Sequence, residues 1–379
     1  MSTVIEKLNE ILVIKNDIKS AIRDKGVEIA DNTPFADYPN CIRSIEQGGD
    51  DRYDEGYSDG YEAGSANGGG NGGEVDSFYI DFFNTKTNNG ANYSSLYRWN
   101  SSETIDISNL NDDNVENIDS MFGGCSDLTT IIGIEDFNAT NLDNLSCAFE
   151  GCRSLESLDL SSWSLSDKRE LRMIRMFNEC RNLREVSLPS ISMVEWEEEF
   201  CYIEAESMFS ECESLQELDF SKWSNIILRN CSAMFNNCRS LRTITRILDW
   251  QFDTDNFSYM FSGCESLEYL DLSGWNKDVC EAENMFNGCR NLIGLRIDNL
   301  NFENCGSTNM MFGDCDKLQL LYLTNCNQDT IRKIIESEEF PSGRVWDEEL
   351  SEEVNRKMYV NRDEIGGLEA PDGWEFVTA

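Results

Sequence analysis

The stretch MFSGCESLEYLDLSGW (residues 260–275) decides the fold, because its core recurs eight times between residues 121 and 326. That core is an aromatic residue followed by x-x-Cys-x-x-Leu-x-x and an apolar residue. The aromatic positions, 25 to 32 residues apart, are Phe122, Phe149, Phe177, Phe209, Phe235, Phe261, Phe286 and Phe312. Repeats of this length are typical of a solenoid, in which each unit buries its apolar face against the next unit. The sequence therefore predicts a stack of coils that presents an extended surface for binding.

The composition excludes several classes of function. The 379 residues carry a formal charge of −40 and include no histidine. Nucleic acids and anionic membranes are bound through Lys and Arg, so a chain this acidic with no basic block is unsuited to either. No run of residues approaches the roughly 20 apolar residues of a membrane-spanning helix, and the start MSTVIEKLNE lacks the basic and apolar regions of a secretion signal. We therefore expect a chain made in the cytosol, with no nucleic-acid partner and no membrane insertion.

Eight of the 15 cysteines occupy one position of the repeat. They are Cys125, Cys152, Cys180, Cys212, Cys238, Cys264, Cys289 and Cys315. A stack of coils needs a small buried apolar residue at such a position, and free cysteine packs as one. The odd total and the lack of a secretion signal also favour reduced, structural thiols over disulfides. Because no CxxC pair and no histidine complete a zinc site, neither a metal nor a cofactor is expected.

Each repeat combines a helix or helical turn with a strand. The residues before the Phe-x-x-Cys core, as in LRMIRMF (171–177), place apolar side chains on one side of a helix or helical turn. The pattern Leu-x-x-Leu-x-Leu after the cysteine predicts a strand, and stacked repeats then form a parallel sheet along one face. The expected fold class is thus an α/β solenoid. Gly133 and Arg246 replace the last apolar residue of the first and fifth copies, which predicts bulged or widened coils there.

The chain divides into five predicted parts. They are a helical attachment and oligomerisation module (1–47), a Tyr/Gly-rich linker (48–73), a β-rich N-terminal cap (74–114), the eight-repeat solenoid (115–326) and a C-terminal cap (327–379). The N-terminal cap is predicted from the alternation of Phe78, Ile80 and Phe82 and from a second strand at TIDIS (104–108). The C-terminal cap contains a short helical stretch, DTIRKIIES.

The N-terminal module contains three short heptads. Its apolar residues alternate four and three positions apart and are interrupted by Lys15. They are Val4, Leu8, Ile11, Ile18 and Ile22. Such a seam predicts self-association, with a homotrimer as the expected state. Because three heptads are marginal alone, the same pattern also fits a helix that packs on its own domain.

The motif MFxGCxSLxxLDLSxW, with its period of 25–27 residues, resembles the BspA-like class of leucine-rich repeats over residues 115–326. The resemblance implies a solenoid with a parallel strand face, used for adhesion and protein binding, commonly on bacterial surfaces. It implies no catalytic residues. Members displayed on bacterial surfaces normally enter by a signal peptide, which the start of this chain does not resemble.

The first 45 residues are similar to short N-terminal modules of structural and fibre proteins of tailed bacteriophages. In those proteins a Gly-rich spacer and a variable distal domain often follow. The matching points are Lys25-Gly26-Val27, Thr33-Pro34-Phe35 and Tyr38. The resemblance implies a virion protein, which is assembled in the bacterial cytoplasm and needs no signal peptide.

Other chemistry has weaker support in the residues. Without histidine, and with no GxSxG, P-loop or GxGxxG in its usual context, no catalytic site is expected. The acidic runs EWEEEF (195–200) and SEEF (337–340) lack calcium-loop spacing, so a solvated acidic surface is favoured over a calcium site. Trp163, Trp223 and Trp275 follow the strands of three repeats, where they either stack on sugars or, as we favour, cover the edge of the core.

Outward-facing strand residues are the best candidates for binding, because they differ from repeat to repeat while the inward ones do not. Toward the C-terminus this face changes from acidic to aromatic and basic. The residues predicted to bind a ligand or partner are Tyr269, Asp271, Arg296, Leu320 and Tyr322. Tyr and Arg are enriched at binding hot spots. The alternative is a solvated sheet face with no ligand.

These observations together favour a bacteriophage structural protein, such as a fibre or other appendage of the virion. Its N-terminus is expected to bind particle proteins, and its solenoid a host cell-surface protein or glycan. Weak contacts become strong when several copies are displayed together. The alternative is a bacterial BspA-like adhesin or an intracellular protein–protein interaction scaffold.

Overall fold

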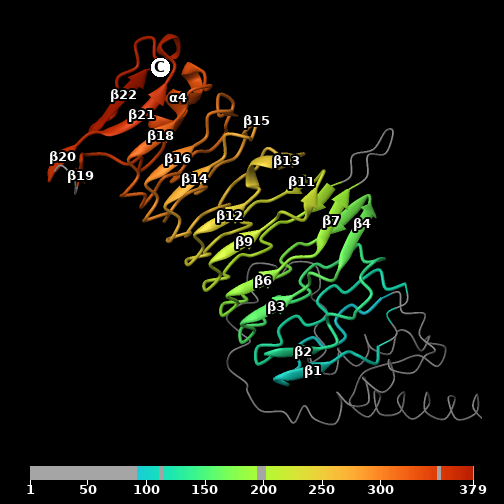
Figure 1. The fold of residues 1–379 in the computed structure, drawn as a ribbon. Coiled ribbons are helices and arrows are strands. Elements are labelled where there is room, and N and C mark those ends of the chain that lie inside the picture. The colour runs from blue at the N-terminus through green and yellow to red at the C-terminus, as the bar shows by residue number, and fades with distance from the viewer. Residues whose placement is uncertain (1–91, 111, 113, 194–201, 348–350, 379) are drawn as a thin grey trace, which may run out of the picture. The chain divides into compact units, whose positions relative to one another are not determined.

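The computed structural model describes residues 92–378, apart from residues 111, 113, 194–201 and 348–350. These residues form a solenoid of stacked coils built from short, mostly parallel strands (Figure 1). Each copy of the sequence motif supplies one coil, so the predicted leucine-rich-repeat-like solenoid is confirmed.

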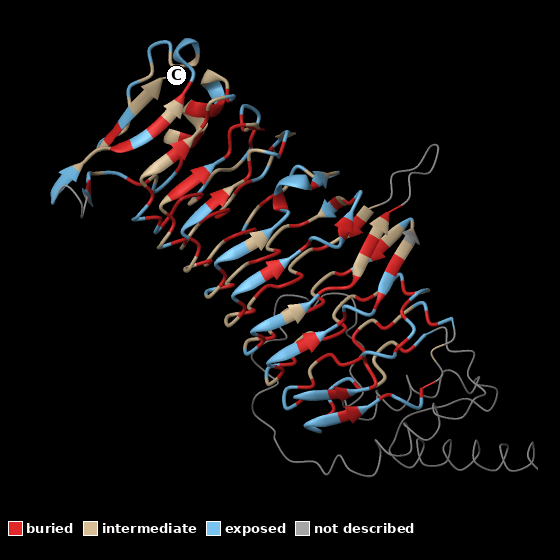
Figure 2. Cartoon of the chain, viewed as in Figure 1, coloured by how far each residue is buried: buried red, intermediate tan, exposed pale blue. Residues whose placement is uncertain are grey.

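The strands that follow the repeat cysteines stack along one side of the solenoid, which we call the strand face, and one strand of the first described coil and two strands after the last repeat extend it (Figure 1). They are β1 (Thr104–Asp106), β2 (Thr130–Ile132), β3 (Ser157–Asp159), β6 (Glu185–Ser187), β9 (Glu217–Asp219), β12 (Thr243–Thr245), β14 (Tyr269–Asp271), β16 (Gly294–Arg296), β18 (Leu320–Tyr322), β21 (Arg356–Val360) and β22 (Trp374–Thr378). Successive side chains of a strand point to opposite faces. In β3 and β9 the middle residue is therefore buried and its two neighbours are exposed, as Figure 2 shows.

Two further sets of short parallel strands lie on the other sides of the coils. One sheet contains β5 (Glu170–Arg172), β8 (Tyr202–Glu204), β11 (Ile227–Asn230) and β13 (Gln251–Phe252). The other set contains β4 (Ser164–Lys168), β7 (Ser190–Met193) and β10 (Trp223–Ser224), with β15 (Lys277–Asp278) and β17 (Leu300–Asn301) in later coils. Each coil is thus held to its neighbours on several sides.

The chain returns to the cysteine through turns and not through a helix. The residues two before and two after each repeat phenylalanine adopt left-handed backbone conformations. Around Phe177 they are Arg175 (φ 53) and Glu179 (φ 60). A right-handed helix does not accommodate such residues. The helical part of the expectation for residues 171–177 is therefore wrong, and β5 followed by a series of turns takes its place.

A column of buried side chains, which we call the Phe–Cys column, runs beside these turns. The repeat phenylalanines stack with ring centroids 5.3 to 6.0 Å apart. The eight repeat cysteines are buried and free, as expected for structural thiols. Each Sγ donates a hydrogen bond to the carbonyl oxygen of the aromatic residue one coil earlier, for example Cys212 to Phe177 at 3.1 Å.

The first described coil lacks the motif but keeps its geometry. Tyr97 takes the place of the phenylalanine and stacks on Phe122, with ring centroids 5.6 Å apart. This coil ends in β1, which confirms the strand predicted at TIDIS. Phe78, Ile80 and Phe82 lie outside the described residues, as does the predicted N-terminal module.

The last coils end in a different arrangement. The helix α4 (Gln328–Ile335) confirms the predicted helical stretch DTIRKIIES. The strands β21 and β22 then extend the strand face, and β19 (Val345–Asp347) pairs antiparallel with β20 (Glu352–Val354). A 3-10 turn, η3 (Arg362–Glu364), connects β21 to the final segment. Among the described residues, no helix is long and apolar enough to cross a membrane.

Candidate functional site

Two coils carry an extra residue immediately after their strand on the strand face. Gly133 (φ 84) and Arg246 (φ 64) adopt the left-handed conformation. The apolar residue due at each position, Ile134 or Ile247, is buried one residue later. After Arg246 the chain makes a 3-10 turn, η2 (Ile247–Asp249), before it returns to the core. The bulges predicted in the first and fifth coils are thus confirmed.

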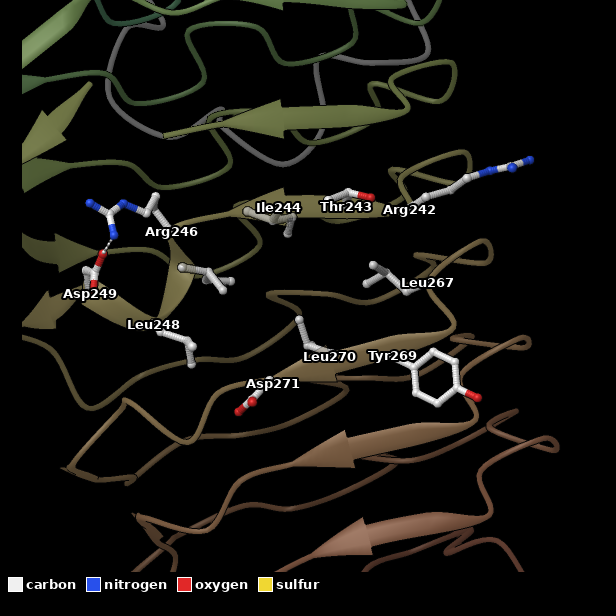
Figure 3. Close-up of a pocket in the computed structure, with 11 residues that line it drawn as sticks. Arg242, Thr243, Ile244, Arg246, Leu248, Asp249, Leu267, Tyr269, Leu270 and Asp271 are labelled. Carbon is white, nitrogen blue, oxygen red and sulfur yellow. Dashed lines mark ion pairs between the residues drawn. The ribbon is translucent and has the colours of Figure 1, made fainter. Parts of the chain in front are cut away.

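A groove opens on the strand face beside the second bulge. Within the described part of the chain, β12 pairs with β9 on one side and with no strand on the other, and β14 begins a separate five-stranded sheet. The space between β12 and β14, the β12–β14 groove, has a volume of about 440 Å³ (Figure 3). Side chains of β12, the bulge and β14 line it.

Charged residues mark both ends of the β12–β14 groove. At one end Arg246 Nη1 lies 3.2 Å from Asp249 Oδ2, and Figure 3 shows this ion pair beside Leu248. Arg242 and Tyr269 lie at the other end (Figure 3). Leu248 is 41% exposed and Tyr269 62% exposed, which is unusual for large apolar side chains in this fold. The groove therefore offers apolar surface between charged ends.

The residues predicted for partner binding lie on β14, β16 and β18, in two rows across the strand face. The first row contains Tyr269, Gly294 and Leu320 in parallel register. Gly294 makes room for the ring of Tyr269, because a Cβ at Gly294 would lie 2.9 Å from Tyr269 Cδ1. The exposed ring therefore lies against the neighbouring strand, whereas Leu320 is half-buried.

The second row contains Asp271, Arg296 and Tyr322, and continues to Tyr359 on β21. The rings of Tyr322 and Tyr359 stack with centroids 4.4 Å apart, and the Arg296 guanidinium lies 5.1 Å from the Tyr322 centroid. A hydrogen bond to Asp298 and the charge of Asp271 raise the pKa of Arg296. We call Arg296, Tyr322 and Tyr359 the aromatic row. The structure thus brings the predicted residues together, and their role in binding stays a prediction.

Tyr359 was missed by the sequence reasoning because it lies beyond the last repeat. The alternation in RKMYV (356–360) marks a strand, and Met358 and Val360 are its buried apolar residues. That pattern was a usable signal for placing Tyr359 on the outward side.

Acidic residues near the N-terminal end of the strand face are hydrogen-bonded within the fold. Ser161 donates to Asp159, and Thr245 and Ser221 donate to Asp219. These hydrogen bonds lower the pKa of both carboxyl groups. Both aspartates therefore stabilise the turn after their own strand, and Asp219 also stabilises the pairing of β9 with β12. Their role is structural.

The three tryptophans considered as sugar platforms are buried, so their place at the edge of the core is confirmed. Trp163 Nε1 donates to Ile134 O at 2.9 Å, and Trp275 Nε1 donates to Ile247 O at 2.8 Å. Both acceptors belong to the bulges, so each bulge supplies a hydrogen-bond acceptor to the next coil. Trp223 follows a coil without a bulge, and its buried Nε1 has no partner among the described residues.

Several predicted sites lie outside the described residues. They include the heptad residues Val4, Leu8, Ile11, Ile18 and Ile22 and the acidic run at 195–200. Where the chain is described, no group of three or more His, Cys, Asp and Glu side chains is arranged to hold a metal ion. The oligomeric state and the N-terminal partners therefore stay predictions.

Comparison with known proteins gives one family and one similar fold. The family described as "Mycoplasma protein of unknown function, DUF285" matches residues 80–197 and 203–325, which is more than half of the chain. A crystal structure of a leucine-rich repeat protein from Bacteroides ovatus ATCC 8483 is similar over 76% of this chain and 77% of that chain, with 16% identity and a TM-score of 0.33. No curated protein matches the chain.

Proposed function

The chain belongs to the DUF285 family, and we propose that it is a protein-binding solenoid whose strand face holds a partner protein. The aromatic row, Arg296, Tyr322 and Tyr359, carries this proposal, together with the exposed Tyr269. Tyr and Arg are the residue types most enriched at binding hot spots. Because the rings are already stacked, binding orders few additional rotamers and costs less conformational entropy.

The charge of the strand face supports a protein partner at its C-terminal half. Outward residues on the early strands include several acids and no base, for example Glu185 and Glu217. On the later strands Arg296 and Lys357 balance Asp271 and Glu375. A nearly neutral aromatic patch on a chain of charge −40 lets a partner approach without the repulsion found elsewhere.

Two biological roles fit such a protein-binding solenoid, and we rank a bacterial adhesin or intracellular interaction scaffold above a virion protein. The virion hypothesis depends on residues 1–47, which lie outside the described residues. Neither the matched family nor the matched structure is described as a virion protein. That hypothesis proposes particle proteins and a host-surface protein or glycan as partners, and a homotrimer as the oligomeric state. Mass spectrometry of purified phage particles tests it, and absence of the chain from them removes it.

Differential capture tests the proposed function. Wild-type protein and the triple variant Arg296→Ser/Tyr322→Ser/Tyr359→Ser are used as baits on extracts of the cells that encode the chain. A matched control is Tyr202→Ser/Arg229→Ser, because Arg229 lies 3.8 Å from the Tyr202 ring on another side of the coils. We expect one or more proteins held by the wild type and the control and reduced at least tenfold with the triple variant. Equal recovery by all three baits would contradict a binding role for the strand face.

A further inference from the structure

We propose that the β12–β14 groove binds an extended segment of the partner protein, with an acidic side chain at Arg242 and an apolar side chain between Tyr269 and Leu248. The inference rests on the proposed function, since it specifies the chemistry of the partner segment. Three separate features of the groove support it: backbone groups without partners, a cation without a carboxylate, and exposed apolar side chains.

The first feature is the interrupted backbone ladder. Where neighbouring strands of the strand face pair, the residue before one strand donates its backbone N–H to a carbonyl oxygen of the preceding coil. The Arg242 N–H donates to Gln216 O at 2.8 Å, and the Ile293 N–H donates to Glu268 O at 2.7 Å. Across the groove, the hydrogen bonds of the described residues include none from the Glu268 N–H to the Arg242 carbonyl oxygen. Open strand edges of this kind accept an extended chain, whose main-chain groups supply the missing hydrogen bonds. Three strand residues span about 10 Å, so a short segment suffices.

The second feature is the charge of Arg242. Arg184 holds the same repeat position and pairs with Glu156 across an intact junction, at 3.1 Å. Gln216 takes the place of Glu156 on the coil before Arg242, and within the described chain no carboxylate pairs with Arg242, Glu268 on the next coil included. Arg246 is already paired with Asp249. Arg242 therefore is the cation of the groove that remains to be paired, which favours an acidic ligand group.

The third feature is the apolar surface. Tyr269 and Leu248 flank the groove and are 62% and 41% exposed, and Ile244 between them is half-buried. Figure 3 shows Tyr269 and Leu248 at opposite ends of the space. An apolar side chain laid between them removes apolar area from water and gives the segment a fixed register. The sequence of the partner segment is thus expected to alternate acidic and apolar residues.

A peptide array tests the inference with the full chain as the soluble probe. The array carries acetylated and amidated octapeptides in which Leu or Phe alternates with Asp, Glu or Lys. We expect the wild type to bind the acidic peptides and not their Lys counterparts. Arg242→Gln and Tyr269→Ala should each weaken binding at least tenfold, whereas Arg184→Gln should leave it unchanged.

A one-residue deletion tests the groove itself. Deletion of Arg246 gives the fifth coil the spacing of the sixth, so we expect β12 to pair with β14 and the peptides to lose binding at least tenfold. Deletion of Gly133 removes the equivalent bulge of the first coil and should leave binding intact. Circular dichroism confirms that both variants fold. Of the two deletion variants, only the one without Gly133 is expected to bind the peptides as the wild type does. Normal peptide binding after deletion of Arg246 overturns the proposal.

The remaining outcomes separate the inference from the proposed function. Equal binding of acidic and Lys peptides, or equal effects of Arg242→Gln and Arg184→Gln, overturns the inference. Binding of acidic oligosaccharides on a glycan array with the same residue dependence, and no peptide binding, also overturns it. If the captured partner is lost with the aromatic-row variant but not with the groove variants, the inference fails and the proposed function stands.

Discussion

The Phe–Cys column and the strand face belong to the same coils, yet only the column is continuous. Ring centroids of successive repeats stay 5.3 to 6.0 Å apart from Phe122 to Phe312, even across the 32-residue interval from Phe177 to Phe209. The strand face instead divides into separate sheets, β1-β2, β3-β6, β9-β12 and β14 to β22. Changes in coil length are therefore accommodated away from the column.

The difference follows from how many interactions fix each region. In the column, ring stacking, a buried S–H donor and two left-handed residues act on the same few positions of every coil. On the strand face a coil contributes only about three residues, so one extra residue shifts the pairing of a whole strand. The column thus provides the stability, and the strand face provides the variation that binding requires.

Alkaline pH should weaken the column more than any single substitution. Burial raises the pKa of the column thiols, to about 12 for Cys289, whereas the pKa of a thiol in the unfolded chain is about 8.5. Below that pH the thiols are protonated in both states. Above it the unfolded chain alone loses protons, so the free energy of unfolding falls until the folded thiols titrate. Each buried thiol is expected to cost about 1.4 kcal/mol per pH unit in that window.

Denaturant unfolding between pH 8 and 9.5 measures this effect. Cys212→Ala is the control, because it removes one titrating thiol and should make the fall with pH shallower. A free energy of unfolding that is the same at both ends of this range would show that the column thiols are not buried as described.

Removing one ring from the column should have the next largest effect. Phe261→Ala is expected to cost about 3–5 kcal/mol, because it leaves a cavity in a buried aromatic stack. Phe261 stacks on Phe235 and Phe286, at 5.6 and 5.8 Å, so the loss should reach the neighbouring coils. Tyr269→Ala, on the strand face of the same coil, should cost less than about 1 kcal/mol. Hydrogen exchange shows how far the loss spreads, and protection lost in the sixth coil alone would contradict coupling between coils.

The sequence predicted the column because phenylalanine, cysteine and leucine recur at fixed positions and each is buried in every coil. It did not predict the turns, since apolar residues in LRMIRMF fit a helix as well as the observed path. The left-handed position two before the phenylalanine carries no glycine to reveal it, being occupied by Ser120, Cys147, Arg175, Ser207, Ala233, Tyr259, Asn284 and Met310. Only the second left-handed position shows glycine, at Gly124, Gly151, Gly263 and Gly288.

A repeated asparagine was the missed signal for these turns. It stands five residues before the aromatic residue and accepts a hydrogen bond from the N–H two residues later, as an Asx turn does. The residues are Asn92, Asn117, Asn144, Asn230 and Asn256.

For the candidate site, the sequence placed Tyr269 and Arg296 on one face and located the bulge at Arg246. The groove depends on whether β12 and β14 pair, which is a property of the backbone that no side-chain pattern records.

Crowding the bulge should destabilise the strand face by an intermediate amount. A Cβ on Gly274 would clash with the backbone carbonyl oxygen of Leu248, so Gly274→Ala forces the fifth coil to move. We expect a loss of about 1–3 kcal/mol in the free energy of unfolding. Gly306→Ala is the control, because the nearest atom to its added Cβ is Cys280 O at 3.5 Å. Equal stability of the two variants would show that the bulge adapts freely.

The smallest expected difference concerns two neighbouring tryptophans. Trp275 and Trp250 are both buried and their rings stack with centroids 6.4 Å apart, but only Trp275 donates to the bulge, at Ile247 O. The Trp250 Nε1 is buried with no hydrogen-bond partner among the described residues. Both changes to Phe remove similar apolar area, so their difference isolates the hydrogen bond, and Trp275→Phe should be about 1 kcal/mol more destabilising. Chemical denaturation of the two variants measures it. If Trp250→Phe proves equally costly, the bulge contributes no net hydrogen-bond energy to the next coil, and its effect is confined to the strand face where it opens the groove.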